Sequence, residues 1–326
     1  MMKNNKFWAM LLNRTPAILL LAVVAIFGSI SGRFFEPQNF LNILVQSSAL
    51  AIAATGMTVV LLTAGVDLSV GSLMFVAVAL AGKMIANDQP VWLSFAVAFM
   101  VGLAGGALNA LLITRFRIVA FIATLATLFI GRGFGLWLTN TRAMNMPDAV
   151  TALGASRCCG IPTPIVVMLL VTVTIHWFLV RTPWGRQVYA VGNDPDAAQK
   201  AGLRVQPILF AAYVICGACA AISGLIALTQ TGAVSPSFGQ QKEFAAIAAA
   251  VLGGTSLFGG RGNVLPGTLF GAILFQTIEN GLVIINADPY LYPMVLSAVI
   301  FLAVFLDTSR QHLVANLSRR TLQSVA

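Results

Sequence analysis

The chain has 326 residues, of which 58% are hydrophobic and only 9% are charged, and its formal net charge is +9. A soluble domain has about a quarter charged residues, so this composition excludes a water-facing globule. The basic residues stand singly between apolar segments, which also argues against a nucleic-acid-binding protein. A polytopic protein of the lipid bilayer is the class that fits.

Ten apolar segments are long enough to cross or enter a bilayer. In chain order they are 16–30, 43–63, 70–85, 91–114, 118–138, 165–180, 208–229, 244–257, 264–285 and 292–306. The eighth and tenth are shorter than a full crossing requires, so they need tilting or extra turns. We therefore expect an all-α polytopic membrane protein with about ten transmembrane helices in a compact bundle, forming a single domain over 1–326.

Basic residues predict the orientation of the segments, because cytoplasmic loops are enriched in Lys and Arg. Placing the N-terminus inside puts most of the 19 basic residues on the cytoplasmic side. Both termini are then cytoplasmic, and segment 181–205 becomes the loop between the sixth and seventh spans. The basic N-terminus and first apolar run also fit a cleaved secretory signal, but the many later segments favour a retained first span.

The loop 181–205 contains two helix-start signals. Thr182-Pro183 and Asp194-Pro195 each place a capping residue before a proline, and Gly202 suits the position after a helix end. These signals predict two short helices outside the bilayer. A helix of about two turns is not stable alone. It needs a surface to dock on, which is either the bundle itself or another protein.

Small residues recur at helical spacing within the apolar segments. Cys216 and Cys219 form a C-x-x-C inside a span, where helix packing explains them better than redox or metal chemistry. A possible internal repeat joins "LLTAGVDLSVGS" after the second span with "VLGGTSLFGGRG" after the eighth. Glycine pairs with G-x-x-x-G spacing predict close helix contacts: Gly102 and Gly106, Gly131 and Gly135, and Gly267 and Gly271.

The sequence lacks the motifs of an enzyme. It has no G-x-x-x-x-G-K-[ST] phosphate loop, no H-E-x-x-H, no G-x-S-x-G and only two histidines. We therefore expect no catalytic residues, no metal site and no bound cofactor. ATP hydrolysis by this chain is not expected either.

Three segments resemble the permease subunits of bacterial ABC sugar importers of the ribose, xylose, arabinose and galactose class. They are "TPWGRQVYAVGNDPDAAQKAGLRV", "GMTVVLLTAGVDLSVGS" and "EFAAIAAAVLGGTSLFGGRG", and "FIATLATLFIGRG" matches a fourth stretch. The matches occur in order over nearly the whole chain. This sequence departs from the family pattern at Gly192, where relatives often have two glycines, at Leu203 and at Ala64.

The resemblance implies a location in the inner membrane, with a second permease subunit that is either the same chain or a paralogue. It implies a periplasmic sugar-binding protein and a cytoplasmic ATPase that uses ATP. The loop 181–205 would seat in that ATPase and couple it to the helices. The residues to which the resemblance assigns this coupling are Gly185, Arg186, Tyr189, Ala190, Gly192, Asn193, Ala197, Ala198, Ala201 and Gly202.

Polar residues within a membrane are costly and are therefore candidates for the translocation path or its gates. The candidates are Asp67, Asn109, Arg132, Glu243, Glu279 and Asn280. Each has a structural alternative, such as a helix cap for Asp67 or an ion pair between Arg132 and Glu279. The same residues leave open a second function, a self-sufficient transporter coupled to protons or sodium.

Overall fold

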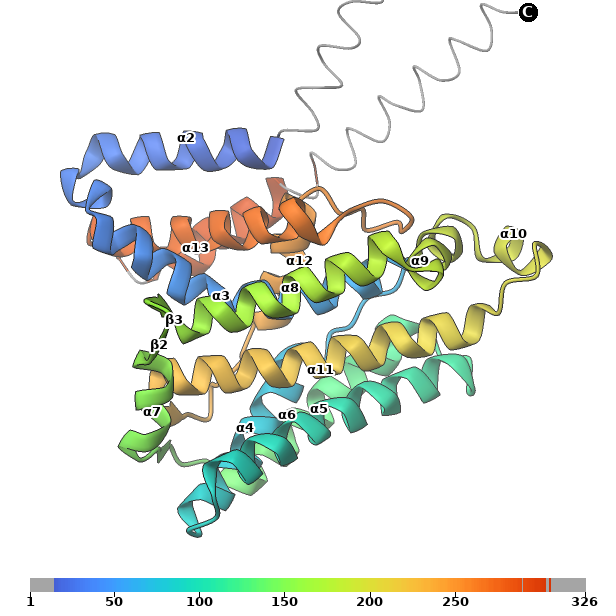
Figure 1. The fold of residues 1–326 in the computed structure, drawn as a ribbon, viewed down its shortest axis with the longest axis horizontal. Coiled ribbons are helices and arrows are strands. Elements are labelled where there is room, and N and C mark those ends of the chain that lie inside the picture. The colour runs from blue at the N-terminus through green and yellow to red at the C-terminus, as the bar shows by residue number, and fades with distance from the viewer. Residues whose placement is uncertain (1–14, 289, 303–304, 306–326) are drawn as a thin grey trace, which may run out of the picture.

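The structure is a computed structural model that describes residues 15–288, 290–302 and 305. Helices dominate this part of the chain, and the long ones run side by side (Figure 1). The long helices are α3 (Pro37–Leu62), α5 (Val91–Thr114), α6 (Ala120–Thr139), α8 (Thr163–Arg181), α11 (Val205–Thr231) and α13 (Leu269–Ile284), which together with the preceding η2 (Val264–Thr268) spans 21 residues.

The remaining elements are shorter, and some of them, such as α4 and α12, pack within the bundle. The short helices are α2 (Thr15–Ile30), η1 (Gly32–Phe35), α4 (Val70–Ala86), α7 (Asp148–Ala155), α9 (Pro183–Asn193), α10 (Pro195–Lys200), α12 (Lys242–Leu252), η2 (Val264–Thr268) and an apolar helix at Leu291–Leu302. Two antiparallel strand pairs are formed by β1 (Met144–Asn145) with β4 (Ala233–Val234) and by β2 (Arg157–Cys158) with β3 (Ile161–Pro162).

The expectation of an all-α polytopic membrane protein is confirmed. Six helices in the described part are long and apolar enough to cross a membrane, and three shorter helices are also apolar. The number of ten crossings stays a prediction. So does the position of the termini, because residues 1–14 and 306–326, with their basic side chains, lie outside the described residues.

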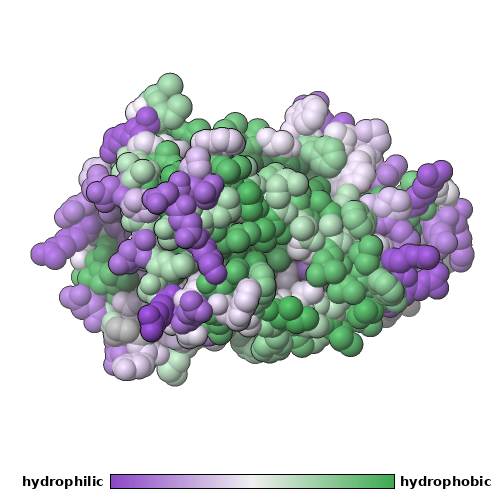
Figure 2. Space-filling model, turned by 90° about the horizontal axis from the view of Figure 1, so that it is seen from below, coloured by the Kyte–Doolittle hydropathy of each residue, from purple (hydrophilic) through white to green (hydrophobic). Residues whose placement is uncertain are grey.

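The surface has the pattern of a protein embedded in a bilayer. A broad hydrophobic belt lies between two hydrophilic ends (Figure 2). On α5 and α6 the belt consists of large exposed apolar side chains, among them Trp92, Met100, Phe129, Ile130 and Trp137. Burying such side chains in lipid rather than water is strongly favourable, so these helices face the hydrocarbon core.

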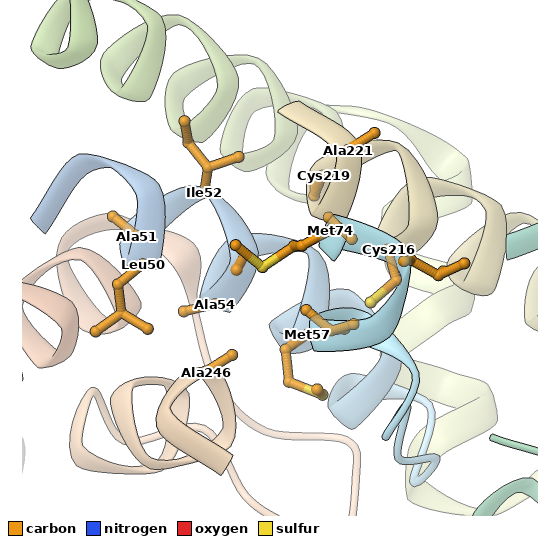
Figure 3. Packing of buried hydrophobic residues seen from close by; sticks show 14 of the residues in the cluster. Leu50, Ala51, Ile52, Ala54, Met57, Met74, Cys216, Cys219, Ala221 and Ala246 are labelled. Atoms are coloured by element: carbon orange, nitrogen blue, oxygen red, sulfur yellow. The ribbon is translucent and has the colours of Figure 1, made fainter. Parts of the chain in front are cut away.

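The core depends on close backbone approach between helices. A Cβ on Gly102 would lie within 2.5 Å of the Ala221 side chain of α11, so only glycine allows this contact between α5 and α11. Cys216 and Cys219 are free, fully buried thiols against Gly56 of α3 (Figure 3). The packing role predicted for these small residues is confirmed.

Candidate functional site

The loop between α8 and α11 folds into the two predicted helices. The hydroxyl of Thr182 accepts from the Gly185 N–H at 3.2 Å, and Asp194 Oδ1 accepts from the N–H groups of Asp196 and Ala197 at 2.9 Å each. Gly202 ends α10 with a φ of +86°, the left-handed region that favours glycine. Helix α9 runs to Asn193, and Asp194, which caps the start of α10, separates the two helices.

One face of α9 packs tightly on the bundle. Its buried residues are Gly185, Val188, Val191 and Gly192. Gly192 lies against the carbonyl oxygen of Leu62, the last residue of α3, and a Cβ there would overlap this oxygen. The same carbonyl accepts a hydrogen bond of 3.0 Å from the Gly260 N–H. The end of α3 and a distant loop therefore meet under α9.

Tyr189 of α9 forms a hydrogen bond to the same loop. Its hydroxyl donates to the Gly262 carbonyl at 3.0 Å. Burial raises the pKa of the phenol above its ordinary value, so the hydroxyl keeps its proton at neutral pH. The bond is thus present over the physiological pH range.

The contacts of α9 bring together the two segments of the possible internal repeat. We call them the two glycine-rich loops, residues 63–69 after α3 and residues 253–262 after α12. They touch directly, because a Cβ on Gly259 would lie 2.7 Å from the Ala64 Cβ. Two segments almost 200 residues apart in the chain therefore meet beside one short helix.

The other face of α9 and most of α10 are exposed, although the backbone and Cβ of Asn193 lie close to Gly260. Arg186, Ala190 and Asn193 are exposed on α9, and they follow one another at helical spacing. On α10, Ala197 and Ala201 are exposed, whereas Ala198 is only 5% exposed and packs on the bundle. The ten residues assigned to coupling therefore divide between a bundle face and a free face.

Asp67 lies in the first glycine-rich loop and is fully buried. Its Oδ1 accepts from the backbone N–H of Ser69 at 2.9 Å and from the Ser69 hydroxyl at 2.6 Å. Asn109 of α5 donates to the Ser69 hydroxyl at 2.7 Å and contacts Asp67 Oδ1 at 3.4 Å. The carboxylate thus fixes the loop locally and ties it to α5. The Cys216 thiol also contacts the Asp67 carboxylate, and within the described residues Asn109 Oδ1 has no hydrogen-bond partner.

The remaining path candidates lie in two other places. Arg132 of α6 donates to the Phe238 carbonyl at 2.5 Å, and its guanidinium lies 5.5 Å from the centre of the Phe75 ring. Glu243, at the start of α12, is 5% exposed. Glu279 and Asn280 lie on α13, which packs on α2, α3 and α12, whereas α6 packs on α4 and α5. The alternative of an ion pair between Arg132 and Glu279 therefore finds no support.

One set of polar residues on α3 was not among the predicted path candidates. Gln38, Asn42 and Gln46 are exposed along one side of α3, and Gln276 of α13 donates to Gln46 at 3.2 Å. Their four-residue spacing is the signal that could have found them. The predicted second segment began at residue 43, so it left the first two outside the helix.

Comparison with known proteins agrees with the permease architecture. A family model described as branched-chain amino acid transport system / permease component matches residues 39–304. The chain is 37% identical over 312 residues to the ribose import permease protein RbsC of Escherichia coli K12, covering 94% of this chain and 96% of that protein.

Two further relatives show the same extent of similarity. The ribose import permease protein RbsC of Bacillus subtilis is 36% identical, with 90% of this chain and 92% of that protein covered. The D-allose transport system permease protein AlsC of Escherichia coli K12 is 34% identical, with 89% of each covered. No solved structure matches the chain. Because the family model and these relatives span most of its length, the chain belongs to the family of ABC import permeases that includes these sugar permeases.

Proposed function

We propose that this chain is the transmembrane subunit of an ATP-driven importer that passes a monosaccharide across the bacterial inner membrane. The observation that carries this proposal is the two-sided α9, with one face packed on the end of α3 and the second glycine-rich loop and the other face exposed. The printed names of the relatives, import permeases for ribose and D-allose, support a sugar as the cargo. No cofactor is needed on this chain, since ATP would be used by a partner.

The topology follows from placing α9 and α10 in the cytoplasm. Successive helices must then alternate in direction, with α2, α4, α6, α11 and α13 running outward. The helices α3, α5, α8, α12 and Leu291–Leu302 run inward. This assignment gives ten crossings and two cytoplasmic termini. With 11 residues, α12 is too short to span the bilayer, so the non-helical stretch 235–241 completes its crossing.

Three partners complete the proposed importer. A cytoplasmic ATPase would hold the loop 181–205, whose exposed Arg186, Ala190 and Asn193 form a polar and small-residue contact surface. A periplasmic binding protein would dock at the opposite end, where α7 and the short strands lie (Figure 1). A second permease subunit, identical or paralogous, would complete the path.

The ion-coupled carrier is the competing function, and reconstitution separates the two. We expect vesicles that contain the permease, its ATPase and its binding protein to take up labelled ribose when ATP is supplied on the side of the membrane that carries the ATPase. Vesicles with the permease alone, under an imposed proton or sodium gradient, should take up none. Gradient-driven uptake by the chain alone would overturn the proposal.

The docking surface has its own test. Arg186→Glu reverses a charge on the free face of α9, and we expect it to weaken co-purification of the ATPase and to reduce uptake. Lys83→Glu reverses another exposed charge, on α4 rather than α9, and serves as the matched control. Equal behaviour of the two variants would count against docking at α9.

A further inference from the structure

One side of α3 has a polar stripe, which we define as Gln38, Asn42 and Gln46. All three side chains are exposed, and Gln38 Nε2 donates to Asn42 Oδ1 at 3.0 Å. At about 100° per residue, positions four apart in a helix stay on one side. The stripe begins one residue into α3 and continues for nine residues, into the first half of a 26-residue helix.

The stripe continues onto the neighbouring helix α13. Gln276 donates to Gln46 Oε1 at 3.2 Å, which places the two amides in contact. Glu279 and Asn280 lie three and four residues after Gln276, so they share its side of α13. Asn280 Oδ1 is buried and has no hydrogen-bond partner among the described residues. The two helices together carry five amides and one carboxylate here, with Gln276 buried and Glu279 and Asn280 half-buried.

The composition of this surface differs from that of the lipid-facing helices. On α5 the exposed positions within the span are occupied by residues such as Trp92, Ala96, Met100 and Leu108. Exposed side chains of α6 are equally apolar. A polar side chain in hydrocarbon costs several kcal/mol, so polar residues within membranes face an interior or a water-filled cavity. The stripe therefore does not face lipid.

We propose that the stripe, with Gln276, Glu279 and Asn280, lines the outer half of the sugar path. This inference rests on the proposed function and assigns its path residues. An amide offers both donors and an acceptor, which suits the hydroxyl groups of a neutral sugar, each of which also donates and accepts. The carboxylate of Glu279 adds one strong hydrogen-bond acceptor.

The burial of residues along α3 shows how far the proposed outer half of the sugar path extends into the membrane. From Leu50 to Leu62 every residue of α3 is buried, so the polar surface stops near the middle of the helix. Under the proposed topology, the stripe opens toward the outside and the inner half of the helix is closed by packing. A sugar released at the outer face would therefore meet hydrogen-bonding groups first and a closed segment beyond them.

Cysteine accessibility tests this assignment directly. We would replace the exposed Cys158 and Cys159 by serine, and then introduce Gln46→Cys or Asn42→Cys. The matched controls are Met100→Cys and Ala96→Cys. Residues 46 and 100 are each nine positions from the first residue of an inward-running helix, and residues 42 and 96 are each five. The intact importer in cells is then treated with a charged, water-soluble methanethiosulfonate.

We expect the stripe cysteines to be modified at least about tenfold faster than the controls, because only a thiolate in water reacts. Modification at position 46 should also block uptake of labelled ribose, whereas modification at position 100 should not. Equal rates in a transport-competent importer would overturn the inference, showing a dry contact between subunits instead. Fast labelling in an importer that moves no sugar would contradict the proposed function rather than the water-filled stripe.

Discussion

The Cα of Gly192 faces the carbonyl oxygen of Leu62, and a Cβ on residue 192 would also lie 2.8 Å from the Gly260 nitrogen. Glycine is needed here for close approach of backbones rather than for an unusual φ angle. One residue of α9 therefore contacts both the end of α3 and the second glycine-rich loop. Any movement of α9 must move these two segments or lose both contacts.

We predict that Gly192→Ala lowers folded-state stability by about 1–3 kcal/mol, the usual cost of overpacking a tight contact. Thermal unfolding of the purified protein and sugar uptake by the importer would both show the loss. The matched control is Gly133→Ala on α6, where a Cβ would meet nothing within 4 Å. An equal response of both variants would show that the contact with Leu62 has no importance.

Neighbouring alanines of α10 separate docking on the bundle from docking on a partner. Ala198 is buried, so Ala198→Leu should lower the melting temperature by overpacking. Ala197 is exposed, so Ala197→Leu should leave the melting temperature unchanged but reduce uptake and ATPase co-purification. Unchanged uptake in Ala197→Leu would show that this side of α10 does not meet the ATPase.

Substitutions at Asp67 test whether its carboxylate is structural or binds a coupling proton. Asp67→Asn keeps the Oδ1 acceptor for both Ser69 donors, so we expect near-normal folding and uptake. Asp67→Ala leaves these buried donors unpaired and should cost about 1–3 kcal/mol of stability. Loss of uptake in a well-folded Asp67→Asn variant would favour the ion-coupled carrier.

We predict that Tyr189→Phe lowers the free energy of unfolding by about 0.5–1.5 kcal/mol, which is the net contribution of one hydrogen bond. The folded state raises the pKa of this phenol and so favours its neutral form. The contribution of the Tyr189 hydroxyl to stability is therefore fully present below the unfolded-state pKa of about 10. It is lost as the pH rises through the pKa of the folded state. The difference in melting temperature between wild type and variant should be constant from about pH 7 to 9 and shrink above that range.

The control for this pair is Tyr290→Phe, because the Tyr290 side chain is 87% exposed. We expect no change in melting temperature for this variant at any of these pH values. A pH-independent difference for Tyr189→Phe would mean that the hydroxyl does not titrate in this range in either state.

Local signals in the sequence predicted the local structure well. Thr182 and Asp194 cap the two short helices as expected, because each capping bond joins residues at most three apart. The apolar segments likewise lie on helices, since hydropathy alone decides which segments enter lipid. Predictions of this kind need no knowledge of the tertiary fold.

The contacts that make the site could not be predicted in this way. The approach of Gly192 to Leu62 joins positions 130 residues apart, and no local pattern encodes it. The burial of Ala198 beside the exposed Ala197 likewise depends on how α10 lies on the bundle. The polar stripe was missed for another reason, since α3 begins at Pro37, six residues before the apolar run that suggested it.

Helix α3 connects the two functional regions physically. It has 26 residues and is therefore about 39 Å long, with Leu62 under α9 at one end and the stripe starting at the other. If it pivots as a rigid rod about its middle, a tilt of about 5° displaces each end by about 1.7 Å, from half its length. When Leu62 moves in one direction, Gln38 at the other end of the rod moves by a similar distance in the opposite direction. ATP-driven motion on one side of the membrane can thus widen or narrow the opening on the other side without any residue between them changing its conformation.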